Sequence, residues 1–403
     1  MKPLGRQLDD LTMAEKKALT HQICDKKMGL LDKDWAELVM EYDLDISPDT
    51  LRKAAVGLKL ANDACMLQDW DIDTVDVISN GYTERQKLRD LTSKVNEVFR
   101  AESRSQLLRE NIYEAIKTLP RITPPETTDI IENPDGKKEL ALALGDFHFG
   151  AKIHVEGLEG ETLNEYNEEV FKHRMTDLFL QTVNIVKRER VGRVHVFLVG
   201  DLIDGMLRQS QLMRLEYGIV ESTVRLSELL AHWLIMLGGM TNVEVYACTG
   251  NHSEVRPLKA KAREYEDENL EKIIMWYLEE RCMEFDKIHV HAECKRYVKA
   301  DVCGYSFLLL HGDGMGNIQQ LARDAVNLYS KPIDFFLCGH KHSEAEFPAG
   351  TTKDGHSVII RVPSICGIDR FAQSLGCGGS AGATAIVMEE GYGRRCVYPI
   401  NLK

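Results

Sequence analysis

The sequence lacks an apolar run long enough to cross a membrane. Its longest such run lies near Leu229–Met240, covers about a dozen residues and contains a histidine, whereas a spanning helix needs roughly 18 apolar residues. The chain also begins without the charged and then apolar segment that is typical of a secretory signal. These absences predict a cytoplasmic protein with no membrane segment.

An excess of positive charge is missing too. The 403 residues include 50 lysines and arginines against 63 aspartates and glutamates, which gives a formal net charge of −13. Proteins that coat nucleic acid by bulk electrostatics usually present a basic face, so any contact with DNA has to be local. The ten cysteines are scattered without a C-x-x-C pair, which argues against a disulfide framework and favours reduced thiols.

The first part of the chain has helical periodicity. Over the first 120 residues, apolar side chains recur three and four positions apart, as they do in amphipathic helices. Ser47 and Pro48 supply a cap and a first-turn proline for a second helix. Residues 1–66 therefore resemble a helix-turn-helix, although an ordinary helical hairpin explains the pattern equally well. Three basic residues lie on the second helix of this pair: Arg52, Lys53 and Lys59.

The rest of the chain divides into three further parts. Residues 67–119 are predicted to form a helical arm. Residues 120–136 read PRITPPETTDIIENPDG, and their prolines and short polar side chains predict an extended linker. In residues 137–403, short β-branched or leucine-rich runs alternate with helical stretches, which predicts buried strands in a layered α/β domain.

Five of these apolar runs end in the same kind of polar motif. ELALAL is followed by GDFH, VHVFLV by GDLID, VEVYACT by GNH, YSFLLL by HGD, and DFFLC by GHKH. Polar side chains at the carboxyl ends of neighbouring strands converge on the crevice where α/β folds place their sites. Each motif alone is ordinary turn chemistry, but five in succession predict a metal site.

The motifs supply carboxylate, imidazole and amide ligands for two divalent ions. Two cations about 3.5–4 Å apart repel each other unless an anionic oxygen lies between them, and Asp201, in the middle of the set, is predicted to bridge them. Asp146, His148 and one histidine of GHKH would complete one ion. Asn251, His311 and the other histidine would complete the second. This nitrogen and oxygen donor set, without cysteine, suits Mn²⁺, with Fe²⁺, Zn²⁺ or Ni²⁺ as alternatives, better than Ca²⁺.

Two further residues are candidates for catalysis. A metal pair lowers the pKa of water toward neutrality and neutralises phosphate oxygens during in-line attack. His252 follows Asn251 but points the other way along extended chain, so we expect it to act as a general acid toward the leaving oxygen. Asp204 would hold the His252 imidazole in the correct tautomer.

Taken in order, GDFH, GDLID, GNH, HGD and GHKH resemble the signature of the calcineurin-like metallophosphoesterases over about residues 138–345. The resemblance implies an α/β fold, a four-layer sandwich of two mixed β-sheets flanked by helices, here with an all-α N-terminal extension. It also implies a dinuclear centre that hydrolyses phosphate mono- or diesters. It assigns Asp146, His148, Asp201 and His342 to one metal, and Asp201, Asn251, His311 and His340 to the other, with His252 as the acid and Asp204 as its support. One position departs from the family pattern, because Ser253 follows the GNH histidine where an acidic residue is usual.

The regions around the motifs bear on the substrate. The insert after GDLIDG, the tail PSICGIDRFAQSLGCGGSAG and the N-terminal extension look like those of phage or prophage metallophosphoesterases, and are distantly similar to those of DNA-repair nucleases. The leading hypothesis is therefore a phosphodiesterase, a nuclease acting on DNA. Three arginines are candidates to hold backbone phosphates by charge-assisted hydrogen bonds, although solvated loop positions explain them equally well: Arg208, Arg214 and Arg256.

Two alternatives stay open. One is a phosphatase or cyclic-nucleotide phosphodiesterase for small substrates, with the N-terminal helices forming a homodimer. The other belongs to a different class, a non-catalytic module that binds DNA or a protein partner on a relic of the phosphoesterase fold. The complete set of ligand residues argues against the second.

Overall fold

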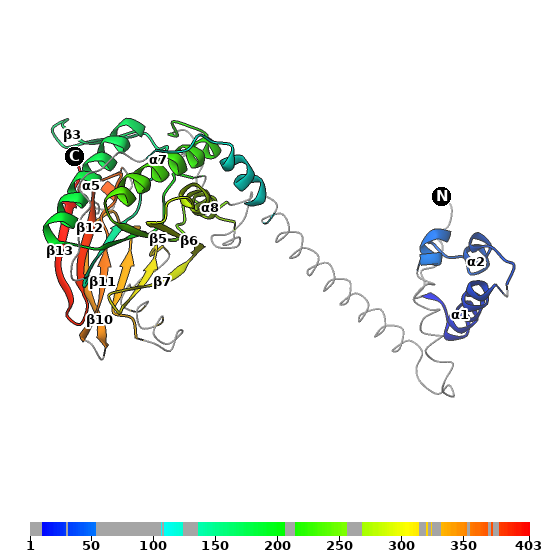
Figure 1. Cartoon of the computed structure of the whole chain (residues 1–403). Helices are drawn as coiled ribbons and strands as arrows, with labels where there is room; N and C mark the ends of the chain where they lie inside the picture. The colour runs from blue at the N-terminus through cyan, green and yellow to red at the C-terminus, as the bar shows by residue number, and fades with distance from the viewer. Residues whose placement is uncertain are drawn as a thin grey trace. The chain divides into compact units, whose positions relative to one another are not determined.

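The computed structural model describes residues 10–29, 31–53, 109–123, 136–205, 214–255, 268–313, 332–352, 355–369 and 379–403, and positions 106, 320, 324, 372 and 373. The chain divides into two compact units, Met1–Gln106 and Leu107–Lys403. Figure 1 shows helices in the first unit, and helices packed on strands in the second.

The N-terminal unit begins with two capped helices, α1 (Met13–Met28) and α2 (Trp35–Glu41). Each begins with a capping box. The side chain of the N-cap residue accepts from the backbone N–H of a glutamate three residues later, and the side chain of that glutamate accepts from the backbone N–H of the N-cap residue. A further helical segment begins at Pro48, where Ser47 Oγ accepts from Thr50 N at 3.1 Å. The core shared by these elements consists of Leu11, Leu19, Ile23, Leu38, Leu44 and Leu51.

The predicted cap at Ser47 and the helices in the described part of the N-terminal region are confirmed, whereas the helix-turn-helix stays a prediction. Lys59 lies outside the described residues. Arg52 and Lys53 each contact a carboxylate oxygen of Asp49 at 2.6 Å, with side chains 55% and 73% exposed. Their positive charge is therefore partly offset locally.

Residues 109–117 are helical and belong to the second unit. Ile116 lies in the main core of that unit, and Arg109 Nη2 donates to Glu279 Oε2 at 2.8 Å. The division between units thus precedes the segment 120–136, of which 124–135 lie outside the described residues. The sequence placed these residues in a separate arm because periodicity shows that a helix is amphipathic, but not what its apolar face contacts.

The larger sheet of the second unit has six strands and mixed directions. Strands β1, β4, β5 and β6 are parallel to one another. Strand β12 is antiparallel to β1, and β13 is antiparallel to β12. In spatial order the strands are β13 (Gly393–Asn401), β12 (Gly382–Glu389), β1 (Lys138–Leu144), β4 (Arg193–Leu198), β5 (Asn242–Cys248) and β6 (Ile288–Lys295).

The second sheet has five strands, of which β8, β9 and β11 are parallel. In spatial order they are β10 (Ala345–Thr352), β11 (Gly355–Arg361), β9 (Phe335–Cys338), β8 (Tyr305–Leu310) and β7 (Tyr297–Val302). A separate hairpin consists of β2 (Ile153–Glu156) and β3 (Thr162–Tyr166).

Strand β1 shows how the layers are held together. Leu140, Leu142 and Leu144 face the core under helices α5 (Glu168–Glu189), α7 (Ile219–Met240) and α8 (Leu270–Cys282). Ala141 and Ala143 face the core between the two sheets. Because strands buried on both faces read as continuous apolar runs, the sequence showed them clearly, and the prediction of two mixed sheets flanked by helices is confirmed (Figure 1). No helix in the described part of the chain combines the length and apolarity needed to cross a bilayer.

Candidate metal centre

Five of the motif residues adopt a backbone conformation that residues other than glycine rarely take. φ is positive at Asp146 (49°), His148 (44°), Asp201 (53°), His340 (71°) and His342 (50°). They are five of the eight non-glycine residues with positive φ in the described part of the chain. Because such strain persists only where surrounding contacts impose it, the strand ends form turns that direct these side chains into one crevice.

The glycines in the motifs allow these turns to approach one another. A Cβ atom on Gly250 would lie 2.1 Å from Asp201 N, and one on Gly339 would lie 2.5 Å from Asp146 Oδ2. Any larger residue would therefore push the ligand-bearing turns apart. This explains physically why glycine precedes the ligand in GD, GN and GH.

The first cluster of ligand atoms consists of Asp146, His148 and His342. The Nε2 atoms of the two histidines are 3.1 Å apart, and they lie 3.8 and 3.5 Å from Asp146 Oδ1. Asp146 Oδ2 accepts from the backbone N of His340 at 2.8 Å. Within the described part, Asp146 Oδ1 and His342 Nδ1 are buried without a hydrogen-bond partner. Buried polar atoms seldom stay unsatisfied, so this cluster fits a bound cation.

The second cluster converges on a single nitrogen of His311. His311 Nε2 lies 2.9 Å from Asp201 Oδ2, 3.1 Å from Asn251 Oδ1 and 3.2 Å from His340 Nδ1. His311 Nδ1 donates to the Val199 carbonyl at 2.9 Å. A neutral imidazole has one N–H, so Nε2 presents a lone pair to two oxygens. That arrangement requires a positive charge, from either a proton or a metal ion.

The pKa shifts of His311, His340 and Asp201 also indicate that a positive charge is favoured at this position. Burial would lower the pKa of His311, but the carboxylate of Asp201 outweighs it and raises the pKa to about 10. Burial and the neighbouring His311 lower the pKa of His340 to about 4. Burial would raise the pKa of Asp201, but His311 and His252 hold it well below its ordinary value. Asp201 and His311 therefore each stabilise the charged form of the other.

Asp201 connects the two clusters. Its ligand atom lies within 4.8 Å of those of His311 and His340, and it forms a second such group with His148 and His252. The donor atoms are imidazole nitrogens and carboxylate or amide oxygens, a set that fits borderline divalent cations. The structure thus brings together all seven residues predicted as ligands, and they fit two divalent ions.

His252 and Asp204 lie beside the first cluster. His252 Nδ1 donates to Asp204 Oδ1 at 2.8 Å, and its backbone N donates to Asp201 Oδ1 at 2.7 Å. The His252 ring meets the His148 ring edge-on at 4.4 Å, and Nε2 is 4.0 Å from Asp201 Oδ2. Ser253 does not orient His252, because its hydroxyl donates instead to Glu271 Oε1 at 2.9 Å. The departure at position 253 therefore leaves the His252–Asp204 pair intact.

The structure does not test the predicted substrate-binding arginines. Arg208 and Arg256 lie outside the described residues. Arg214 is described, and its carbonyl accepts from Lys152 N at 2.8 Å. The proposal that these three arginines hold phosphates stays a prediction.

The sequence did not identify Cys366 as a neighbour of the centre. Its Sγ lies within 4.8 Å of ligand atoms of His148 and His342, and the residue is fully buried. Its backbone N donates to the Asp146 carbonyl at 3.2 Å. Our donor set excluded cysteine. The sequence did contain one indication of its position, because PSIC follows β11, another parallel strand of the second sheet. No polar motif marks the end of that strand.

Glu271 is a second residue that the sequence did not reveal. From α8 its Oε1 accepts from Leu202 N at 2.9 Å and its Oε2 from Gly250 N at 2.5 Å. Burial and the nearby charge of Asp201 raise its pKa to about 7. This buried carboxyl group ties together the turns that carry Asp201 and Asn251. In the sequence it was one of several glutamates in an amphipathic stretch.

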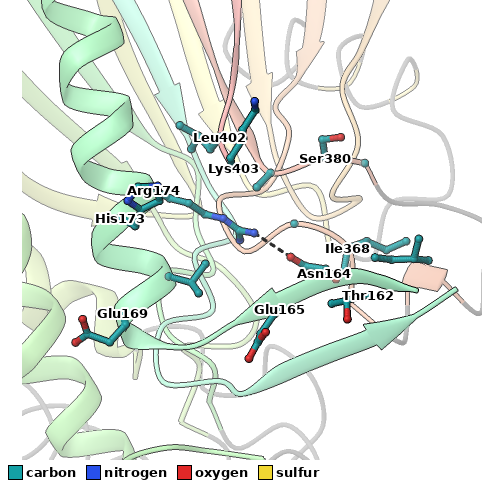
Figure 2. Close-up of a pocket in the computed structure, with 15 residues that line it drawn as sticks. Thr162, Asn164, Glu165, Glu169, His173, Arg174, Ile368, Ser380, Leu402 and Lys403 are labelled. Carbon is teal, nitrogen blue, oxygen red and sulfur yellow. Dashed lines mark hydrogen bonds between the residues drawn. The ribbon is translucent and has the colours of Figure 1, made fainter. Parts of the chain in front are cut away.

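A buried arginine holds the segment that contains Cys366. Figure 2 shows Arg174 of α5 directed at Asn164 of β3, and its Nη2 donates to Asn164 Oδ1 at 2.9 Å. Arg174 Nη1 donates to the carbonyls of Ile365 and Cys366 at 3.0 and 2.9 Å. Asn164 Nδ2 donates to the Cys366 and Ile368 carbonyls. Together these two side chains fix residues 365–368 against the first cluster.

Replacing Arg174 by methionine is expected to lower the free energy of unfolding by about 3 kcal/mol, because it removes the three hydrogen bonds that Arg174 donates to the oxygens of Ile365, Cys366 and Asn164. Urea denaturation of the full chain would measure the loss. Arg188→Met is the matched control, since Arg188 is on the same helix with a side chain 75% exposed, and its loss should stay below about 0.5 kcal/mol. Equal losses for the two variants would refute the role assigned to Arg174.

The two-sheet sandwich, with histidine and aspartate clusters at its strand ends, agrees with the fold that the resemblance to the calcineurin-like metallophosphoesterases implied. No family model matches the chain. A curated relative is the SPbeta prophage-derived uncharacterized protein YonJ of Bacillus subtilis (strain 168), 28% identical over 317 residues, or 78% of this chain and 76% of the relative.

Solved structures with detectable similarity include a novel archaeal phosphodiesterase, at 11% identity and a TM-score of 0.31 over 65% of this chain and 99% of that one. Another is Vps29 of Entamoeba histolytica complexed with zinc, at 11% identity and a TM-score of 0.30 over 66% of this chain and 99% of that one. At this level the similarity indicates neither the metal nor the substrate of this chain.

Proposed function

We propose that this protein is a metal-dependent phosphoester hydrolase with a dinuclear centre. The observation that carries the proposal is the arrangement around His311 Nε2 in the second cluster, where two oxygens and a nitrogen meet a lone pair. The first cluster lies beside it and contains the unsatisfied oxygen of Asp146. Two cations would satisfy both clusters at once, and Asp201 would supply negative charge to both.

The roles of the residues follow from their positions. When bound, the metal pair would supply Lewis acidity toward phosphate oxygens and lower the pKa of water. His252 would donate a proton to the leaving oxygen, since Asp201 and Asp204 raise its pKa above the ordinary value although burial opposes them. Asp204 fixes the His252 tautomer through Nδ1. Glu271 positions the backbone of the two turns.

We propose further that the substrate is a phosphodiester in DNA and that Mn²⁺ is the working metal. A separate N-terminal unit with its own core supports a role in placing a large substrate, and Arg52 and Lys53 are exposed on it. A phage or prophage origin is part of this proposal, since the Bacillus subtilis relative is described as prophage-derived. Dimerisation through the N-terminal helices is an additional proposal.

A substrate panel tests this function. Full-length protein with Mn²⁺ is expected to hydrolyse bis-p-nitrophenyl phosphate and to cleave DNA, and to lose both activities when a chelator removes the metal. Charge reversal at Arg52 and Lys53 should weaken DNA cleavage without changing hydrolysis of the small diester, because these residues lie in the other unit. The control is Lys117→Glu, which reverses an exposed charge in the second unit.

The same panel separates the alternatives. Hydrolysis of p-nitrophenyl phosphate alone would identify a phosphatase, and hydrolysis of cyclic nucleotides alone a small-substrate phosphodiesterase. Failure to hydrolyse any ester with Mn²⁺, Fe²⁺, Zn²⁺ or Ni²⁺ would overturn the enzymatic proposal and leave a binding module.

A further inference from the structure

A second group of metal-ligand side chains lies on the six-stranded sheet away from the candidate centre. Glu244 of β5 and His289 and His291 of β6 offer one carboxylate oxygen and two ring nitrogens, all within 4.8 Å of one another. Glu244 lies about 13 Å before β5 reaches its carboxyl end at Cys248. Since the candidate centre follows that carboxyl end, the group is separate from it.

Strand register brings the three side chains together. Glu244 pairs with His289 across the parallel β5–β6 ladder, and the next pair is Val245 with Val290. His289 and His291 are two residues apart, so they share a face of β6. A register irregularity follows between Val245 and Ala247. The three ligand atoms thus converge on one face of two hydrogen-bonded strands, and no long flexible loop has to be ordered to form the group.

The rings are also held in place. His291 lies parallel to Tyr246, with ring centroids 4.0 Å apart and an angle of 11° between the planes. His289 meets His291 edge-on, with centroids 4.4 Å apart and an angle of 80°. This packing restricts ring rotation before any ligand binds. A preformed arrangement lowers the entropic cost of binding.

The two oxygens of Glu244 have different neighbours. Oε2 lies 2.9 Å from His291 Nε2, whereas Oε1 faces Arg193 Nε at 3.7 Å. The carboxylate is therefore oriented by Arg193 on one side and offers its other oxygen to the histidines. The side chains of His291 and Glu244 are 34% and 20% exposed, and His289 is exposed. An ion can reach the group from solvent.

We propose that Glu244, His289 and His291 bind one Zn²⁺ ion, independently of the phosphoester chemistry. Two imidazoles and one carboxylate form a common zinc donor set, and three protein ligands leave a position for water. Strand β6 is the edge of the six-stranded sheet. A bound ion therefore joins the edge strand to its neighbour β5.

Zinc stoichiometry of the full chain tests the site. The wild type is expected to bind one more equivalent of Zn²⁺ than either His289→Ala or His291→Ala, whatever the occupancy of the candidate centre. Anomalous scattering at the zinc edge should place an ion beside Glu244 Oε2. His232→Ala is the matched control, because His232 is an exposed histidine 3.7 Å from Glu228 that belongs to no three-ligand group in the described part.

Hydrogen exchange gives a second readout. Amides of β6 that exchange by separation from β5 should slow by a factor of about 1 + [Zn²⁺]/Kd, which is about 100-fold at 100 times Kd. His289→Ala should abolish this slowing and leave Mn²⁺-dependent hydrolysis unchanged. The proposal is overturned if both histidine variants keep the wild-type zinc stoichiometry, or if no anomalous peak lies at Glu244.

Discussion

Replacement of Asp201 by asparagine is expected to lower Mn²⁺-dependent phosphoester hydrolysis by at least about a thousandfold. The substitution preserves shape but removes the charge that lies within reach of both ligand clusters. Without that charge, two divalent cations at close range repel each other. Losing several kcal/mol of transition-state stabilisation by a metal corresponds to roughly three decades in rate.

Metal analysis separates this effect from a general loss of structure. The Asp201→Asn protein should bind fewer than two equivalents of Mn²⁺ after dialysis, with an unchanged far-ultraviolet circular dichroism spectrum. Asp286→Asn is the control, since Asp286 is exposed in the turn before β6, and it should keep both metal and activity. Wild-type metal content together with wild-type rates in the Asp201 variant would refute the bridging role.

The convergence of the candidate ligands was predictable because sequence and topology agree at the strand ends. A buried parallel strand reads as an apolar run, and its carboxyl end faces the crevice of the fold. A glycine precedes the first polar residue in four of the five motifs, GDFH, GDLID, GNH and GHKH, and it is required where turns approach closely, as at Gly250 and Gly339. Each of these motifs therefore combined an apolar run, a close approach and a polar ligand. The position of Asp201 followed from that combination, whereas His311 follows its apolar run directly.

The supporting contacts were not predictable, because they join distant segments without a local pattern. Arg174 contacts the carbonyl of Ile365, which is 191 positions later in the chain. Glu271 acts from a helix whose periodicity indicates only an apolar face. Cys366 follows a strand with no polar motif. The order of the strands in the sheet was not predictable either, since β1 pairs with β12, which lies near the other end of the domain in the sequence.

Replacement of His252 by asparagine is expected to slow DNA cleavage by about 10²- to 10⁴-fold, the usual contribution of a general acid. Hydrolysis of bis-p-nitrophenyl phosphate should fall by less than about tenfold, because p-nitrophenolate leaves readily without a proton, so little of the general-acid contribution applies. His154→Asn is the matched control, since His154 pairs with Glu156 at 3.2 Å and its side chain is 49% exposed. It should leave both rates unchanged.

Metal content decides between two roles for His252. Its Nε2 is 4.0 Å from Asp201 Oδ2 and its ring is close to that of His148, so a ligand role has to be tested directly. A general acid predicts that the asparagine variant keeps both metals and loses activity only toward the poorer leaving group. Asp204→Asn should produce the same selectivity to a smaller degree, because it replaces the charged acceptor of the Nδ1 proton by a neutral amide. Loss of metal with an equal fall for both substrates would instead make His252 a ligand and refute the acid role.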